Sequence, residues 1–369
     1  MALFTDISPN AQPRPRRHWT GWTILGIGLV GVVTVALVPA PFVIEQPGPV
    51  YNTLGDVTID GEQVPMIQIP DEQTYPTDGS LDMLTVSIRG NRQELPSWLE
   101  IATAYFDPSK SVVPVELIYP AGVSLEDSNN QGRVDMANSQ KEAVAAALTQ
   151  LGYTFASTVT VVETSPASPS DGILEAGDVL LSVNGETFAD VTGLRAEIAA
   201  NGVDKAAAID ITRNGQPETV EITPTLSGGD NAVPIIGIIA GGDYDFPFDV
   251  NIQLENVGGP SAGMMFALGI IDKLTEGELN GGEIIAGTGT ISGSGEVGQI
   301  GGIQQKMFGA KNAGATSFLA PESNCDEVTG HIPDGLQVFA VATLDDALAA
   351  LDAIETGAST TGLPTCPAP

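Results

Sequence analysis

The stretch Asn256-Val-Gly-Gly-Pro-Ser-Ala-Gly-Met-Met-Phe266 is the most informative part of this chain. Ser261 stands between Pro260 and a pair of small residues, and the apolar run behind it predicts a helix over 264–271. Glycines let a substrate approach the backbone closely, and a helix N-terminus offers unpaired N–H groups to a developing negative charge. The stretch therefore fits a serine nucleophile with an oxyanion site beside it. It fits equally a Gly-Pro turn whose serine only caps the helix.

The general base for such a serine is hard to find. Histidine is the usual base, and the chain has two histidines. His18 precedes an apolar run that predicts a membrane span, and His331 stands alone in a loop, so no Ser-His-Asp arrangement is evident. The alternative is a lysine kept neutral by burial. A Ser-x-x-Lys spacing is absent because Met264 follows Ser261 by three, so a lysine base must come from a distant segment.

Composition limits the class of protein. The chain has 369 residues, 42% of them hydrophobic, which is enough for two or three domains with a substantial core. Its formal net charge is −32, which excludes nucleic acid as the main partner because phosphate binding needs a basic surface. The sequence contains neither a Gly-x-x-x-x-Gly-Lys-(Ser/Thr) motif nor a Cys/His cluster with metal-ligand spacing. We therefore expect no ATPase module, no metal and no other cofactor.

Residues 22–44 are almost wholly apolar and carry no charge, so they predict a transmembrane signal-anchor helix. Three arginines precede the run and an acidic residue follows it, which places residues 1–21 in the cytoplasm and the rest outside the cell membrane. A cleaved signal peptide is the alternative, with Val38-Pro-Ala40 as a weak cleavage site. We favour the uncleaved anchor because the run exceeds a usual signal core.

The two cysteines fit an extracytoplasmic location. An oxidising exterior permits a disulfide between Cys325 and Cys366. Such a bridge would pin the Pro-rich tail, residues 356–369, to the last domain. Two unpaired thiols are the alternative.

Residues 151–228 predict a compact unit rich in β-strands. They contain Ser165-Pro-Ala167, Gly177-Asp-Val-Leu-Leu181 and the hairpin signal Val183-Asn-Gly185. In this order the three motifs resemble a PDZ domain of the bacterial protease type. The resemblance implies a groove that binds an extended peptide at a sheet edge.

The elements that match the groove of such domains are a loop, the strand behind it and a later helix. We expect peptide binding by Gly152, Tyr153 and Phe155 in the loop, by Val159 in the strand and by Leu194 in the helix. The expected ligands are proteins or peptides, bound by their C-terminal ends. A domain that serves only as a packing spacer is the alternative.

Residues 229–355 alternate predicted strands and helices, which is typical of an α/β layer fold. They contain Gly259-Pro-Ser-Ala-Gly263, Thr288-Gly-Thr-Ile-Ser-Gly-Ser-Gly-Glu-Val297 and Ile300-Gly-Gly-Ile-Gln-Gln-Lys306. These ordered motifs closely resemble the proteolytic domain of Lon proteases. One departure is Gly258, where Lon itself usually has Asp. The membrane-anchored, PDZ-bearing Lon-like proteases resemble this chain in lacking that acid, and the departure leaves open what orders the serine loop.

The resemblance implies a Ser-Lys dyad, with Ser261 as the nucleophile and Lys306 as the general base. It implies that Thr288 orients the lysine amine, and that Ala262 and Gly259 are supporting or oxyanion residues beside the N–H of Ser261. Helical geometry alone does not select the base, because Lys306 and Lys311 flank the same apolar face of the predicted helix 303–313. Activity would require burial, which lowers the pKa of a lysine toward neutrality.

The expected protein is a multidomain α+β and α/β chain: a cytoplasmic tail (1–21), a transmembrane helix (22–44), an extracytoplasmic region (45–150), a PDZ domain (151–228), a Lon-type proteolytic domain (229–355) and a C-terminal tail (356–369). A strand predicted at 81–88 suggests that region 45–150 packs on the protease domain, with the PDZ domain inserted between two parts of one fold. The expected function is a membrane-anchored, ATP-independent serine endopeptidase. A catalytically silent, PDZ-led binding or scaffold protein is the alternative, and a homo-oligomer is among the expected partners because Lon proteolytic domains often form rings.

Overall fold

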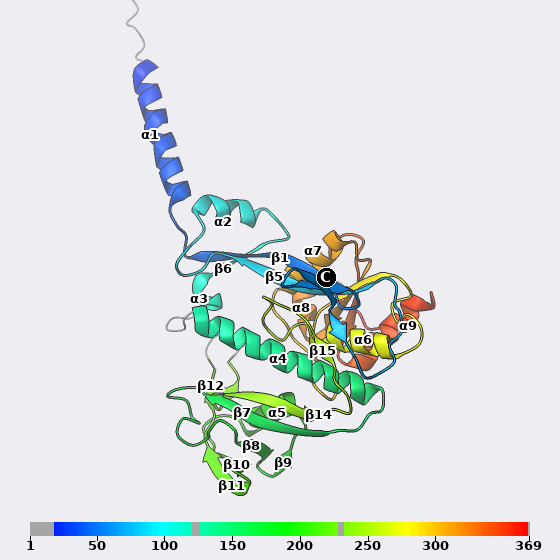
Figure 1. Cartoon of the computed structure of the whole chain (residues 1–369). Helices are drawn as coiled ribbons and strands as arrows, with labels where there is room; N and C mark the ends of the chain where they lie inside the picture. Colours follow the sequence, from blue (N-terminus) through cyan, green and yellow to red (C-terminus); the bar gives the residue numbers. More distant parts are fainter. Residues whose placement is uncertain (1–17, 120–124, 228–231, 368–369) are drawn as a thin grey trace, which may run out of the picture.

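The computed structural model describes residues 18–119, 125–227 and 232–367, with residues 18–20 described by their backbone alone. The cytoplasmic tail predicted at 1–21 therefore lies almost wholly outside the described residues, as does the predicted boundary at 228 and 229. The described part contains two large sheets with a long helix, α4 (Leu125–Gln150), between them (Figure 1).

The first sheet draws its strands from both ends of the chain. Its spatial order is β20 (Gln337–Val341), β19 (Ser317–Pro321), β16 (Ile284–Gly287), β5 (Ser80–Arg89), β1 (Phe42–Asn52) and β6 (Ser111–Pro114). The pairs from β20 to β5 are parallel, and β1 is antiparallel to both of its neighbours. Strands that precede the PDZ domain and strands that follow it thus form one sheet.

Both faces of this sheet are covered, as the near-continuous apolar runs of parallel strands require. On one face, Met83 and Leu319 join a core with α4, α6 (Gly263–Leu274) and α9 (Leu344–Glu355). On the other face, the neighbouring residues Leu84 and Phe318 pack with α7 (Ile303–Ala313). Successive strand residues point to opposite faces, so α6, which begins just after Ser261, and α7, which carries Lys306, lie on opposite sides of the sheet.

The second sheet belongs to the PDZ unit. Its order is β11 (Gln216–Ile222), β10 (Ala207–Arg213), β8 (Val179–Val183), β7 (Ala156–Thr164) and β14 (Ile238–Asp245), with β9 (Glu186–Thr187) paired to β8. All of these pairs are antiparallel, and α5 (Val191–Asn201) covers the sheet. The predicted end of this unit at residue 228 is too early, because β14 completes its sheet.

Smaller elements accompany the two large sheets in the described residues. Four two-stranded ladders pair β2 (Asp56–Ile59) with β3 (Glu62–Pro65), β4 (Ile67–Gln68) with β15 (Asn251–Ile252), β12 (Thr225–Leu226) with β13 (Pro234–Ile235), and β17 (Thr290–Ile291) with β18 (Val297–Gly298). The remaining helices are α1 (His18–Leu37), α2 (Trp98–Tyr105), α3 (Val115–Ile118) and α8 (Cys325–Val328), the last preceded by a 3₁₀ turn, η1 (Glu322–Asn324).

The N-terminal helix ends earlier than predicted. α1 stops at Leu37, and residues 42–44, which the sequence assigned to the helix, begin the buried strand β1. Pro39 and Pro41 explain the break, because proline lacks the N–H that a helix interior needs. The apolar run of the sequence is thus shared between a helix and a sheet.

Within the part of the chain that the structure describes, no helix combines the length and the apolar character needed to cross a membrane.

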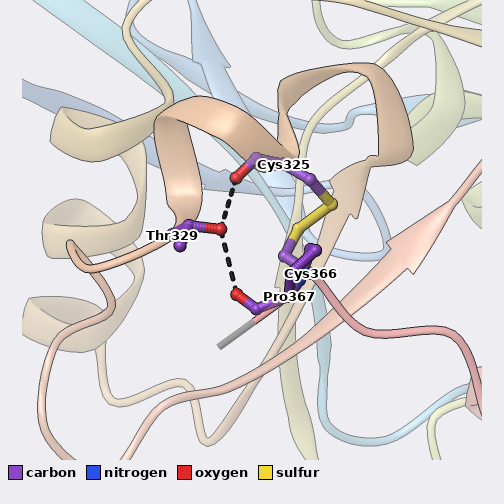
Figure 2. The surroundings of a disulfide bond; sticks show 4 residues. All are labelled: Cys325, Thr329, Cys366 and Pro367. Atoms are coloured by element: carbon purple, nitrogen blue, oxygen red, sulfur yellow. Dashed lines mark hydrogen bonds between the residues drawn. A yellow bond between two sulfur atoms is a disulfide. The ribbon is translucent and has the colours of Figure 1, made fainter. Parts of the chain in front are cut away.

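The structure joins Cys325 and Cys366 by a disulfide (Figure 2). Thr329 reinforces this link, since its Oγ1 lies 2.8 Å from the carbonyl oxygen of Cys325 and 3.0 Å from that of Pro367. The N–H of Ala340 in β20 also donates to the carbonyl of Pro364. The C-terminal segment therefore lies against the first sheet.

Candidate active site

Ser261 ends an irregular loop at the start of α6. The loop turns at Gly259, whose φ of +88° lies in the left-handed region that favours glycine. α6 then begins at Gly263 with Ala262 as its N-cap, and its apolar residues from Met264 to Ile271 are buried. The buried helix holds the loop from one side, so Ser261 occupies a fixed position at a helix N-terminus.

Lys306 lies at the end of the first turn of α7. Its side chain is 3% exposed, and its Nζ lies 2.8 Å from Oγ of Ser261 and 3.0 Å from Oγ1 of Thr288. Among the described residues, no acidic side chain forms an ion pair with it. Burial disfavours the charged amine and lowers the pKa of Lys306 to about 7. Of the two lysines that the helical geometry left open, Lys306 is the one beside the serine, whereas Lys311 is exposed.

Thr288 joins the serine and the lysine. It is fully buried between β16 and β17, where its Oγ1 accepts a hydrogen bond from Nζ of Lys306 and donates one to the carbonyl oxygen of Ser261 at 3.0 Å. The N–H of Gly289 donates to the same carbonyl at 2.9 Å. The hydroxyl of Thr288 thus acts as an acceptor for the amine and as a donor to the backbone of the serine, and it positions both.

Two backbone N–H groups are available beside Oγ of Ser261. Within the described residues, the N–H groups of Ser261 and Ala262 have no hydrogen-bond partner. The N–H of Gly259 is different, because it donates to the carbonyl oxygen of Gly132 in α4 at 2.8 Å. Of the two roles predicted for Gly259, supporting or oxyanion residue, this contact favours the supporting one, because its N–H is engaged and its backbone shapes the loop.

Two hollows meet at Ser261. One, of about 480 Å³, is lined by β1, by residues 83–87 of β5, by Met136 of α4 and by the serine loop. The other, of about 420 Å³, lies between Pro260 and residues 299–301. A chain passing through both would cross the serine, so the site has room on each side of a bond held there.

The predicted peptide-binding residues of the PDZ unit mostly lie elsewhere. Gly152 follows the end of α4, the ring of Tyr153 packs on Phe248, and the ring of Phe155 packs against Tyr244 and Phe246. Val159 is buried in the core of the unit. Both edges of its strand, β7, are paired, with β8 on one side and β14 on the other. The strand that was expected to receive a peptide is therefore not free to do so.

A groove of about 300 Å³ lies instead between α5 and the segment 234–240. Leu194, the one predicted residue that lines it, stands there with Ile198 and Arg195. Gly237 turns the segment with a φ of +76°, and its carbonyl is held by Ser165 and Ser168. Within the described residues, the N–H groups of Ile236 and Gly237 have no partner. The groove thus combines apolar walls, a cation and free backbone donors.

The sequence carried a signal for this groove that the predicted boundary hid. Ile235-Ile-Gly-Ile238 places a glycine among apolar residues directly before a strand, which is typical of a tight turn that exposes its N–H groups. It lies beyond residue 228, where the PDZ unit was expected to end.

Comparison with known families identifies a protease unit and a PDZ unit, although the PDZ match includes α4 and ends before β14. Residues 256–353 match the model of the Lon protease (S16) C-terminal proteolytic domain, and residues 122–223 match the PDZ domain model. The Lon protease of Lachnoclostridium phytofermentans is 37% identical over 93 residues, which are 24% of this chain and 11% of the relative. The Lon protease of Clostridioides difficile is 36% identical over 93 residues, 24% of this chain and 12% of the relative.

These matches cover a small part of each relative, since this chain spans about 11–12% of the curated Lon proteases named above. Among solved structures, the PDZ domain of the SdrC-like protein from Listeria innocua is 26% identical and aligns with 22% of this chain and 92% of its own, at a TM-score of 0.21. The chain contains a Lon protease C-terminal proteolytic domain and a PDZ domain, and the first of these supports a serine-type peptidase.

Proposed function

We propose that the protein is an ATP-independent serine endopeptidase in which Ser261 is the nucleophile and Lys306 the general base. The observation that supports this best is the buried amine of Lys306, 2.8 Å from Oγ of Ser261, with a pKa lowered to about 7 by burial. An amine with that pKa is substantially neutral at physiological pH and can take a proton. The absence of a nucleotide-binding Gly-x-x-x-x-Gly-Lys-(Ser/Thr) motif from the sequence supports independence from ATP.

The reaction follows from this arrangement. Neutral Lys306 takes the proton of Ser261 while Oγ attacks the peptide carbonyl, and the N–H groups of Ser261 and Ala262 stabilise the oxyanion. Collapse of the tetrahedral intermediate breaks the C–N bond, and the lysine returns its proton to the leaving amine. Water, deprotonated by the same lysine, then releases the acyl group and restores Ser261.

The substrate would bind as an extended chain along β5. β16 ends opposite Met83, so within the described residues the edge of β5 from Leu84 to Ser87 has no partner strand on that side. The same residues line the hollow beside Ser261. An unpaired strand edge forms main-chain hydrogen bonds with any extended peptide, which fits an endopeptidase acting on unfolded segments or loops.

The PDZ groove would bind the C-terminal end of a protein. Its free N–H groups at Ile236 and Gly237 and the guanidinium of Arg195 suit a carboxylate, and Leu194 and Ile198 suit an apolar last side chain. Selection from a library of peptides with free C-termini tests this. Arg195→Glu should remove the preference for a free carboxylate over an amide, and retention of that preference would contradict the assignment.

Membrane attachment through α1 is part of the proposal. The large apolar side chains of α1 from Trp22 to Leu37 are 49–74% exposed on a helix that extends away from the two sheets (Figure 1). At its base, α2 presents Trp98, Leu99 and Tyr105 on one exposed face. Apolar surfaces of this kind are typical of contact with lipid, and aromatic residues favour its interface. The residues that follow α1 would then lie outside the cell membrane, and those that precede it would lie in the cytoplasm.

Protease accessibility tests the location. In intact spheroplasts, added proteinase K should degrade the part of the chain that carries the two sheets. Protection of that part until the membrane is ruptured would contradict an extracytoplasmic location.

The decisive experiment for catalysis is mass spectrometry of the full-length protein after treatment with a fluorophosphonate probe, beside Ser261→Ala and Lys306→Ala. Labelling should map to Ser261 in the wild type and vanish in both variants while their folds persist. A Lys306→Ala protein that labels at the wild-type rate would refute the dyad. A folded wild-type protein that never labels would favour the PDZ-led scaffold.

A further inference from the structure

α4 holds the serine loop, although it precedes the PDZ unit in the chain. Oγ of Ser139 donates to the carbonyl oxygen of Pro260 at 2.8 Å, and Ser139 is only 4% exposed. About two helical turns nearer the N-terminus of α4, the carbonyl of Gly132 accepts the N–H of Gly259 at 2.8 Å. The helix therefore binds the backbone directly before the nucleophile at two points.

The bond from Ser139 controls the direction of an N–H group. The carbonyl of Pro260 and the N–H of Ser261 belong to one peptide unit, which is planar and trans, so the two groups point in opposite directions. Because Ser139 holds the carbonyl toward α4, the N–H of Ser261 points away from the helix. Thr288 acts in the same way on the next unit, since it holds the carbonyl of Ser261 and thereby directs the N–H of Ala262.

The same helix is fixed to the PDZ unit by the residues next to Ser139. Nδ2 of Asn138 donates to the carbonyl of Ala240 at 2.9 Å, and Nζ of Lys141 donates to that of Gly242 at 3.1 Å. Both carbonyls belong to β14, and Ala240 also lines the PDZ groove. Figure 1 shows α4 lying between the two sheets. One helix thus contacts the groove strand and the serine loop through adjacent residues.

A third contact ties α4 to the turn between β17 and β18. Glu142, 5% exposed, accepts the N–H of Gly293 through Oε2 at 2.6 Å. Gly293 lies in the turn between β17 and β18, a few residues after Thr288. The helix is therefore bonded both to the serine loop and to the turn that follows Thr288.

We propose that Ser139 is a positioning residue for the peptidase reaction, which orients the N–H of Ser261 as an oxyanion donor, and that β14 of the PDZ unit braces α4 for this task through Asn138. This inference rests on the proposed function. It makes the PDZ unit a support of the active site as well as a binding module, and it supplies the anchor of the serine loop that Gly258 cannot give.

The test measures fluorophosphonate labelling of Ser261 in the full-length chain as a function of probe concentration and pH. Ser139→Ala should lower the maximal labelling rate about tenfold, and Asn138→Ala about threefold, because oxyanion donors act on the transition state. The half-saturating probe concentration and the pH midpoint should stay within about twofold and a few tenths of a pH unit of wild type, since neither side chain touches Lys306. A general distortion of the cleft would change the maximal labelling rate, the half-saturating probe concentration and the pH midpoint together.

Thr149→Ala is the matched control, because it removes an exposed hydroxyl from the same helix far from the loop. Wild-type protein that labels no faster than Ser261→Ala would contradict the proposed function itself. Labelling of Ser139→Ala at the rate of Thr149→Ala, in a wild type that labels, would overturn the positioning role alone. Unchanged labelling of Asn138→Ala would overturn the bracing by β14.

Discussion

Replacing Lys306 by methionine should stabilise the fold while it abolishes the reaction. The side chain is almost fully buried, and its amine is held by the hydroxyls of Ser261 and Thr288 without an ionic partner among the described residues. Methionine has a similar length and no charge, so it fills the same space without the cost of burying an ammonium group.

The magnitude follows from the pKa of Lys306, which burial lowers from 10.5 to about 7. A lowered lysine pKa means that the unfolded chain binds the proton more readily, so the penalty on folding is full below pH 7 and disappears as pH rises toward 10.5. A difference of about 3.5 pH units corresponds to about 5 kcal/mol. Loss of two hydrogen bonds offsets about 1–3 kcal/mol of this. We expect Lys306→Met to gain about 3 kcal/mol at pH 6 and to lose nearly all of that gain by pH 9.

Urea denaturation of the full-length protein at pH 6 and pH 9, followed by tryptophan fluorescence, measures the gain. Lys311→Met is the matched control, because Lys311 is exposed on the same helix, and it should change stability by less than about 0.5 kcal/mol at either pH. A Lys306→Met protein that is no more stable than wild type at pH 6, or whose gain in stability is equal at both pH values, would refute the reasoning that burial of Lys306 lowers the free energy of unfolding.

Three further predictions follow from the site. The rate of fluorophosphonate labelling should rise with pH through a midpoint near 7, because only neutral Lys306 accepts the proton; a rate that falls over that range would contradict the lysine base. Thr288→Val should slow labelling about 10- to 100-fold, with an unchanged circular dichroism spectrum, since it removes the partner of both Nζ and the Ser261 carbonyl; labelling within twofold of wild type would contradict this. Replacing Cys325 and Cys366 by serine should lower the free energy of unfolding by about 4 kcal/mol, because the bridge closes a loop with a sequence separation of 41; a loss below 1 kcal/mol in urea denaturation would show that the tail contributes little.

The local elements of the fold were predictable because their residues carry local signals. The helix predicted at 303–313 matches α7, the strand predicted at 81–88 matches β5, and the apolar run after Ser261 forms α6. The pair Ser261 and Lys306 was predictable only through the resemblance of its motifs, since helical geometry treated Lys306 and Lys311 alike. What distinguishes them physically is burial, which depends on the sheet that α7 covers.

Long-range contacts could not be predicted in the same way. Nothing in the composition of α4 indicates that Ser139 would meet Pro260, because a serine in a helix usually faces solvent or its own backbone. The engagement of Gly259 by Gly132 is equally a backbone contact without a sequence signature. The predicted position of the PDZ groove is wrong for a different reason. The groove is formed by β14, which pairs with β7 in the sheet but is separated from it in sequence by the rest of the unit.

The order of strands in the first sheet has a consequence for how the chain is made. Ser80 in β5 pairs with Ile284 in β16, so the centre of the sheet closes only after the whole PDZ unit has been synthesised. Contacts so distant in sequence form slowly, and Lys306, the proposed general base, lies later still. A nascent chain would therefore be unable to cleave other proteins during its synthesis. It would gain proteolytic activity only when its C-terminal part has folded.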